Sequence, residues 1–215
     1  MRQGVEAEEV SLGTTELEVS RETRDQLSVF VDLLIRWSAT INLVADAERG
    51  TIWQRHVADS LQLLPLLDGR EPPALDLGSG AGFPGLVLAL ASGRLFHLLE
   101  ADRRKAAFLR EAARITAAPV IVHPERIETV RIEPVSVVTA RALAPLPKLV
   151  ALARPFLRPD GVLLCLKGRK AAAELTAARA QWHMQATVTP SRTHRSGVIL
   201  QISEISRARQ HRCGP

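Results

Sequence analysis

The chain has 215 residues, of which 46% are hydrophobic and 24% are charged. This length fits one full α/β domain with a small helical addition and excludes two large domains, and the apolar share excludes intrinsic disorder. The net charge of +5 suits an anionic partner such as nucleic acid without requiring one.

Cysteine usage and the lack of a long apolar stretch predict the compartment. Cys165 lies in an apolar run and Cys213 lies near the end, so the two form neither a disulfide framework nor a metal site. The first residues lack the apolar region of a secretory signal, and no stretch approaches the roughly 18 apolar residues of a membrane span. We therefore expect a soluble, cytoplasmic protein that binds neither metal nor membrane.

The N-terminal third is predicted to be helical. Residues 1–19 show no sustained period and are expected to form a loose lead-in. A helical annex then covers residues 20–70, because apolar residues recur at three-to-four spacing after Ser20, a suitable N-cap. A second amphipathic helix is predicted over residues 51–67, and Gly69 ends it.

Short apolar runs alternate with helical segments from residue 71 to residue 206. This alternation is typical of a doubly wound, mostly parallel sheet with helices on both faces, so we predict an α/β domain here. The expected strands are residues 74–77, 95–99, 120–122, 135–139, 162–166, 186–189 and 198–202, the last two forming an antiparallel hairpin. The expected helices are residues 84–91, 102–116, 146–157 and 169–181. The basic residues 207–215 are expected to be a solvated tail, with an RNA-binding arm as the alternative.

A glycine-rich loop joins the strand 74–77 to the next helix. Four of the eight residues from Gly78 to Gly85 are glycine. Glycines let the backbone turn tightly and approach a ligand, and the N-terminus of the following helix offers free N–H groups. Pro84 suits the first helical position because it has no N–H group. The pattern predicts a cofactor-binding loop at the carboxyl end of the first strand.

Two cofactors fit the spacing of this loop. Gly80, Gly82 and Gly85 satisfy the dinucleotide fingerprint, and Glu100 follows Gly80 by 20 residues, so a nicotinamide cofactor remains open. The register Asp-x-Gly-x-Gly-x-Gly, counted from Asp76, instead resembles motif I of the class I S-adenosylmethionine-dependent methyltransferases. That resemblance implies four cofactor-binding residues: Asp76, Gly78, Gly80 and Glu100. As alternatives, Asp76 caps a helix or pairs with an arginine, and Glu100 is a surface acid.

Six separated motifs narrow the resemblance to one family. They are Asn-Leu at 42–43, Arg-His-Val-Ala-Asp-Ser-Leu at 55–61, the glycine-rich segment at 75–85, Leu-Glu-Ala-Asp-Arg-Arg-Lys-Ala-Ala-Phe-Leu at 99–109, Thr-Ala-Arg-Ala at 139–142 and Leu-Lys-Gly at 166–168. In this order they resemble the bacterial 16S ribosomal RNA guanine-N7 methyltransferases, formerly called glucose-inhibited division protein B, over about residues 20–170. The resemblance implies methyl transfer from S-adenosylmethionine to guanine N7, with 16S ribosomal RNA or the small ribosomal subunit as partner. No obligate protein partner is evident.

The resemblance also implies a set of cofactor contacts: Gly78, Phe83, the pair Ile127 and Glu128, and Arg141. From their positions after predicted strands, Arg141 and Lys167 are expected above the sheet, where they would grip the cofactor carboxylate, the guanine O6 or a flanking phosphate. Guanine N7 has an exposed lone pair, so we expect catalysis by positioning without a general base. A surface ion pair is the alternative for each of the two cations.

The helical annex is expected to flank the cofactor pocket and to help bind RNA through Asn42, Arg55 and His56. A hydrogen-bonded scaffold role is the alternative for His56. The three tryptophans are expected in the core rather than stacked on a base. Three other classes remain open: a nicotinamide-dependent oxidoreductase, a small-molecule methyltransferase and an RNA-binding protein without activity.

Overall fold

A seven-stranded sheet forms the centre of the computed structural model, which describes residues 19–208. Its strand order is β3-β2-β1-β4-β5-β7-β6. Neighbouring strands from β3 to β5 pair in parallel, and β7 pairs antiparallel with both β5 and β6. The predicted doubly wound, mostly parallel sheet with a closing hairpin is therefore confirmed. The expectations for residues 1–18 and 209–215, including Cys213, lie outside the described residues.

The elements follow the predicted order closely. The strands are β1 (Ala74–Leu77), β2 (Phe96–Leu99), β3 (Val120–His123), β4 (Val135–Arg141), β5 (Leu157–Lys167), β6 (Trp182–Pro190) and β7 (Val198–Arg207). The α-helices are α1 (Arg21–Ser38), α2 (Arg49–Ile52), α3 (Ala58–Leu61), α4 (Gly85–Ser92), α5 (Arg103–Thr116), α6 (Leu146–Ala153) and α7 (Ala171–Arg179). A π-helical turn, η1 (Trp53–Val57), and two 3-10 turns, η2 (Leu64–Leu67) and η3 (Arg154–Phe156), complete the set within residues 19–208.

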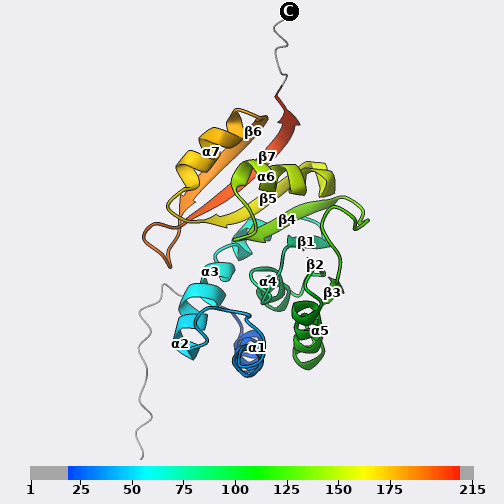
Figure 1. Ribbon diagram of the computed structural model, residues 1–215, viewed down its shortest axis with the longest axis vertical. Coiled ribbons are helices and arrows are strands. Elements are labelled where there is room, and N and C mark those ends of the chain that lie inside the picture. Colours follow the sequence, from blue (N-terminus) through cyan, green and yellow to red (C-terminus); the bar gives the residue numbers. More distant parts are fainter. Residues whose placement is uncertain (1–18, 209–215) are drawn as a thin grey trace, which may run out of the picture.

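Helices cover both faces of the sheet, with α1, α4 and α5 on one face and α6 and α7 on the other (Figure 1). Side chains alternate between the two faces along each strand. In β5, Val162, Leu164 and Leu166 pack in the core with α1, α4 and α5, whereas Leu163 and Cys165 pack in the core with α6 and α7. The helical annex thus shares a core with the sheet. No helix within residues 19–208 combines the length and apolar character needed to cross a bilayer.

The prediction of one continuous helix over residues 51–67 is wrong. The segment is divided into α2, η1, α3 and η2. In η1 the N–H of Ala58 donates to the carbonyl of Trp53, five residues earlier, so this turn holds one residue more than an α-helical turn. Near the end, Pro65 lacks the N–H that an α-helix would need and is the second residue of the 3-10 turn η2 instead.

Three smaller predictions have different outcomes. Ser20 is confirmed as the N-cap of α1, because its hydroxyl accepts the N–H of Thr23 at 3.1 Å. Pro84 is the N-cap of α4 rather than its first residue. Arg207 is the last residue of β7 rather than part of a solvated tail, and its guanidinium carbon lies 4.2 Å from the centre of the Trp182 ring.

Candidate functional site

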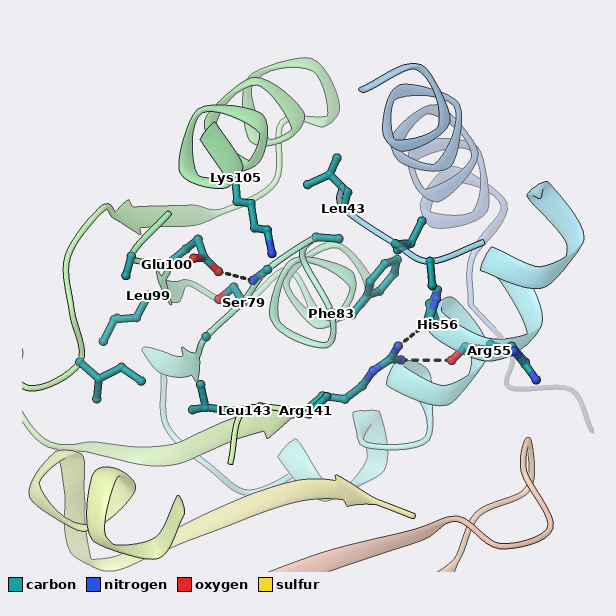
Figure 2. A pocket seen from close by; sticks show the side chains of 18 of the residues that line it. Leu43, Arg55, His56, Ser79, Phe83, Leu99, Glu100, Lys105, Arg141 and Leu143 are labelled. Atoms are coloured by element: carbon teal, nitrogen blue, oxygen red, sulfur yellow. Dashed lines mark hydrogen bonds between the residues drawn. The ribbon is translucent and has the colours of Figure 1, made fainter. Parts of the chain in front are cut away.

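Two adjoining cavities lie at the edge of the sheet where the parallel strands end. The first has a volume of about 590 Å³ and is lined by residues that follow β1, β2 and β3 and by the end of β4. Figure 2 shows Glu100 and Arg141 on opposite sides of this first cavity, with Lys105 reaching in from α5. The volume lies in the usual range for small-molecule sites, and the carboxyl ends of strands are where open α/β sheets bind ligands.

Bare backbone of the glycine-rich loop lines the first cavity. Gly78 and Gly80 have φ angles of +66° and +55°, in the left-handed region that glycine adopts without strain. A Cβ atom at Gly78 would lie 2.7 Å from Cδ1 of Leu143, a side chain that also lines the cavity. A Cβ atom at Gly80 would have only the carbonyl oxygen of Gly78 within 4 Å, at 3.8 Å. A side chain at Gly78 would therefore displace Leu143 from the cavity wall, and one at Gly80 would extend from that wall into open space.

Glu100, directly after β2, is held by the loop opposite. Its Oε2 accepts the N–H of Gly80 and its Oε1 accepts the N–H of Asp102, both at 2.8 Å. Each carboxylate oxygen can accept a further hydrogen bond. Glu100 is therefore fixed in orientation at the cavity wall, rather than being an unengaged surface acid, and it can still accept hydrogen bonds from a ligand.

Arg141, at the end of β4, connects the sheet to the helical annex. Its Nη2 donates to Nδ1 of His56, and its Nη1 donates to the carbonyl oxygen of Arg55 at 3.1 Å. The same Nη1 lies 3.4 Å from Oδ2 of Asp59. The Phe83 ring lies against this group, with its centre 5.5 Å from the guanidinium carbon and 5.0 Å from the centre of the His56 ring. Side chains from three distant segments thus form one wall (Figure 2).

Burial shifts the pKa values of His56 and Arg141, the two ionisable side chains that meet in this wall. Burial, followed by the charge of Arg141, lowers the pKa of His56 from 6.5 to about 4. The neutral imidazole can accept a hydrogen bond at Nδ1, which an imidazolium cannot. Burial also lowers the pKa of Arg141, while Asp59 and Asp76 raise it, and a guanidinium stays charged throughout the working range of pH. His56 therefore serves as a neutral support for a fixed positive charge.

Asp76 lies beneath the first cavity instead of lining it. Side chains of β1 alternate between faces, and Asp76 points toward the start of α4, where it is completely buried. Its Oδ1 accepts the hydroxyl of Thr139 at 2.6 Å, and its Oδ2 accepts no hydrogen bond from the described residues. Burial raises the pKa of Asp76 to about 6, against the hydrogen bond from Thr139 that lowers it. The structure therefore separates Asp76 from the other residues of motif I.

The remaining predicted residues divide into two groups. Ile127 and Glu128 line the first cavity from the segment after β3, and Arg55 is exposed and lines both cavities. Asn42 is exposed and lines neither cavity, because the annex turns its neighbours Leu43 and Val44 inward instead. The structure thus brings together every predicted site residue except Asn42 and Asp76.

A second cavity of about 820 Å³ adjoins the first and shares Arg55, Arg141, Ala142 and Leu143 with it. Lys167, at the end of β5, lines only this second cavity. Its ammonium donates to the carbonyl of Ala144 at 2.6 Å and to Oε2 of Glu174 at 2.8 Å. Lys167 thus forms an ion pair, as the predicted alternative has it. The pair does not lie on the open surface but at a cavity wall, where the lysine side chain is only 9% exposed.

Sequence reasoning missed Glu174. It lies in the first turn of α7, where acidic residues are common for helix stability alone, so the chain offers no local signal of a site. Its Oε2 also accepts the N–H of Leu146 at 2.8 Å. Burial raises the pKa of Glu174, but the hydrogen bonds from Lys167 and Leu146 outweigh it, and the pKa lies below its ordinary value. The carboxyl group is therefore ionised at neutral pH.

Asp59 and Gln62 tie the annex to the loop between β6 and β7. Oδ1 of Asp59 accepts the hydroxyl of Thr193 at 2.8 Å, and Oε1 of Gln62 accepts the N–H of Arg192 at 2.6 Å. Ser191, Thr193 and His194 of this loop line the second cavity. Because Asp59 also pairs with Arg141, one cluster positions both the shared wall and the far rim of the second cavity.

The lining of the first cavity fits S-adenosylmethionine. That molecule has an ammonium group, a carboxylate, ribose hydroxyls and an adenine ring. The cavity offers carboxylates for the ammonium and hydroxyls, cations for the carboxylate, and apolar side chains for the ring; these include Glu100, Glu128, Lys105, Arg141, Leu99 and Ile127. Gly78 and Gly80 present bare backbone to this cavity. The donor set thus matches the chemical groups of this cofactor.

Two core predictions bear on competing chemistries. Cys165 is completely buried in β5, and burial raises the pKa of its thiol to about 12, so it is not available as a nucleophile of the kind that methylation at cytosine C5 requires. Trp182 is 5% exposed, as predicted for a core residue. Trp37, whose ring centre lies 5.7 Å from that of Phe108, and Trp53 are partly buried and pack against the core.

Comparison with known proteins identifies relatives over most of the chain. Residues 23–200 match the sequence profile of the family described as rRNA small subunit methyltransferase G. A ribosomal RNA small subunit methyltransferase G from Granulibacter bethesdensis is 54% identical over 88% of this chain and 89% of its own length. One from Gluconobacter oxydans is 51% identical over 88% of this chain and 97% of its own length.

Solved structures share the fold at low sequence identity. The glycopeptide N-methyltransferase MtfA, complexed with S-adenosyl-L-methionine, superposes with a TM-score of 0.59 at 12% identity, over 69% of this chain and 93% of that one. The magnesium protoporphyrin IX methyltransferase of Synechocystis, with bound S-adenosylmethionine, gives 0.58 at 13% identity, over 88% and 100%. The sheet and helices are thus arranged as in these two methyltransferases.

Proposed function

The chain belongs to the rRNA small subunit methyltransferase G family, and on this premise we propose that it transfers a methyl group from S-adenosylmethionine to N7 of a guanine in 16S ribosomal RNA. The observation that carries the proposal is the junction of the two cavities at Arg141. A ligand in one cavity and a base in the other would come into contact beside the residues that the two cavities share. With rRNA as the substrate, we expect the activity in the cytoplasm.

In the first cavity, the chain's own residues bind and orient the cofactor. Glu100 accepts hydrogen bonds from ribose hydroxyls, because its carboxylate is already aligned by Gly80 and Asp102. Gly78 and Gly80 allow close approach of the backbone. Ile127 and Glu128 close the cavity after β3, and Asp76 supports the loop from beneath.

Catalysis rests on positioning. When bound, S-adenosylmethionine supplies an electrophilic methyl group carried on a sulfonium. Guanine N7 already has a lone pair, so the chain needs no group to remove a proton from it. Arg141, held by His56, Arg55 and Phe83, orients the reacting groups at the junction and excludes water there.

In the second cavity and at its rim, cations face the RNA. Arg55 is exposed beside both cavities, and Lys167 lines the second one. Arg192 and Arg195 are exposed on the β6–β7 loop that Asp59 and Gln62 hold in place. The exposed arginines suit contacts to phosphate oxygens, which supply most of the affinity in RNA binding, whereas the nearly buried Lys167 faces the cavity itself.

The test measures transfer of labelled methyl from S-adenosylmethionine to small ribosomal subunits and to deproteinised 16S RNA, both from cells lacking this gene. We expect label in 7-methylguanosine after nucleoside analysis, and the substrate that accepts it shows whether the folded particle is required. No label in either substrate, from a chain that binds S-adenosylhomocysteine, would overturn the proposal.

Variants test the site. Arg141→Ala is expected to lower kcat/KM at least about a hundredfold, because an oriented cation at the junction is lost. Arg158→Ala is the matched control, since Arg158 pairs with Glu71 at 3.0 Å and lines neither cavity. Equal losses in both variants would show that Arg141 acts only through general stability.

A further inference from the structure

Two unused hydrogen-bonding groups stand side by side in the second cavity. The ammonium of Lys167 has three N–H donors, and within residues 19–208 two of them have acceptors, the carbonyl of Ala144 and Oε2 of Glu174. Oε2 of Glu174 accepts from Lys167 and from the N–H of Leu146, whereas Oε1 accepts from none of the described residues. One donor and one acceptor therefore remain available in a pair that lines the cavity.

We infer that Lys167 and Glu174 read the Watson–Crick edge of the target guanine, with Lys167 donating to O6 and Oε1 of Glu174 accepting from N1–H. The inference rests on the proposed function and deepens it by naming the residues that select the base. Guanine presents the acceptor O6 beside the donor N1–H, which complements the donor and acceptor of the pair. Adenine presents the donor N6 beside the acceptor N1, so both contacts would be unfavourable.

The position of the pair agrees with methylation at N7. Lys167 and Glu174 line the second cavity only, whereas Arg141 and Leu143 line both cavities. In the purine, N7 lies on the opposite side of O6 from N1. A guanine whose O6 and N1 face the pair therefore turns N7 away from Glu174, toward the wall that the first cavity shares.

The pair is also fixed before the base arrives. Its side chains are 9% and 23% exposed, and its hydrogen bonds connect the end of β5 and the first turn of α7 to the start of α6. Preorganised polar groups at a partly dry wall cost little to align. They also reject a base that leaves them unpaired, because an unmatched polar group loses its hydrogen bond to water without gaining another.

Glu174→Gln isolates the selecting atom. Lys167 and the N–H of Leu146 both donate at the position of Oε2, so the amide oxygen must stay there and the amide NH₂ takes the place of Oε1. The variant thus replaces the acceptor Oε1 by an NH₂ donor and keeps the hydrogen bonds from Lys167 and from the N–H of Leu146. Glu71→Gln is the control, since Glu71 is an exposed partner of Arg158 and lines neither cavity.

The experiment uses RNA with guanine, inosine or 2-aminopurine at the methylated position, in the form that the wild-type chain methylates. Inosine keeps O6 and N1–H, whereas 2-aminopurine keeps N7 but lacks both. We expect wild type and Glu71→Gln to methylate inosine within about tenfold of guanine, and 2-aminopurine at least about a hundredfold less efficiently in kcat/KM. In Glu174→Gln the preference for guanine over 2-aminopurine is expected to fall at least about tenfold, since the amide can donate to N1. S-adenosylhomocysteine binding, measured by calorimetry, should not change.

Two results would overturn the assignment of Lys167 and Glu174 as the residues that select the base. Wild-type methylation of the 2-aminopurine RNA at the rate of the guanine RNA overturns the inference without any variant, and so does an unchanged preference in Glu174→Gln. If Glu174→Gln loses S-adenosylhomocysteine binding, it is misfolded, and the three bases compared on wild type settle the question. Failure of the wild-type chain to methylate guanine RNA refutes the proposed function instead.

Discussion

Burial shifts the pKa values of two ionisable residues next to the first cavity, Asp76 and His56, in the direction that favours their uncharged forms. Burial raises the pKa of Asp76 from 3.8 to about 6 and lowers that of His56 from 6.5 to about 4. In the range between these values, the folded chain holds a proton on Asp76 that the unfolded chain has released, and it lacks a proton on His56 that the unfolded chain binds. The two effects on the pH dependence of stability therefore oppose each other.

Asp76→Asn removes the titration of Asp76 and so isolates its contribution to the pH dependence of stability. Because the raised pKa makes wild type lose stability as the pH rises from 4 to 7, the free energy of unfolding of wild type relative to Asp76→Asn should fall by about 2 kcal/mol over that range. Urea unfolding at closely spaced pH values measures it. Parallel pH profiles for the two chains would mean that Asp76 titrates normally.

His56→Gln should have the opposite effect. The lowered pKa gives wild type stability at neutral pH that is lost as the pH falls through 6.5 toward 4. The free energy of unfolding of wild type relative to His56→Gln should therefore fall by about 2 kcal/mol between pH 7 and pH 4, a value that allows for solvent screening of the partly exposed ring. The same urea series reports it, and glutamine can still accept the hydrogen bond from Arg141. A difference independent of pH would contradict a neutral, buried imidazole.

At the scale of elements, the start of α4 packs closely against β1 and β2 beneath the glycine-rich loop. A Cβ atom at Gly85 would lie 2.5 Å from Cβ of Asp76 and 2.6 Å from Cδ2 of Leu98. Helix and strand can approach so closely only because this residue has no side chain. At the other end of α4, Gly93 has a φ of +66° and a Cβ atom there would have nothing within 4 Å, so only its backbone requires glycine.

Alanine at these two ends should therefore have unequal costs. Gly85→Ala forces the helix away from β1 and is expected to destabilise the chain by about 3 kcal/mol, because overpacking must move backbone. Gly93→Ala keeps the packing and should cost about 1 kcal/mol for its left-handed conformation. Urea unfolding compares them, and Gly85→Ala should also weaken S-adenosylhomocysteine binding, since it shifts the loop. Equal costs would contradict this account of the packing.

At the scale of the whole molecule, a net charge of +5 becomes useful only where cations gather near the site. Arg55 and the arginines of the β6–β7 loop come from distant parts of the chain and lie around the second cavity. The loop reaches this place because Gln62 and Arg192, 130 residues apart, are hydrogen-bonded. Association with rRNA should therefore depend on salt through these few contacts.

Arg55→Ala should weaken rRNA binding and reduce the slope of log affinity against log salt by about 1, as expected for one lost phosphate contact. Alanine keeps the carbonyl that accepts Arg141, so S-adenosylhomocysteine binding should persist. Filter binding at several salt concentrations measures the slope. Arg24→Ala, on the exposed side of α1, is the control and should leave it unchanged. Identical slopes for both variants would exclude Arg55 from the RNA surface.

The sequence by itself determined most of the elements and the cofactor loop of this protein, but not the division of residues 51–67 into short helical turns. Strand 74–77, the helix predicted over 102–116 and the cap at Ser20 depend on neighbouring residues, and the structure has each within one residue. The density of glycines after β1 predicted the position of the first cavity. This was possible because positive φ angles are a local requirement that the residue itself must satisfy. Family motifs then extended the prediction to Phe83, Ile127, Glu128 and Arg141.

Only the tertiary structure decided which side chains meet. It placed Asp76 under the loop, left Asn42 outside both cavities and inserted a π-helical turn that carries Arg55 and His56. It also paired Lys167 with Glu174 at a cavity wall. Such contacts depend on the packing of segments that are far apart in the chain, as with Arg141 and His56, 85 residues apart, and no local pattern encodes that packing.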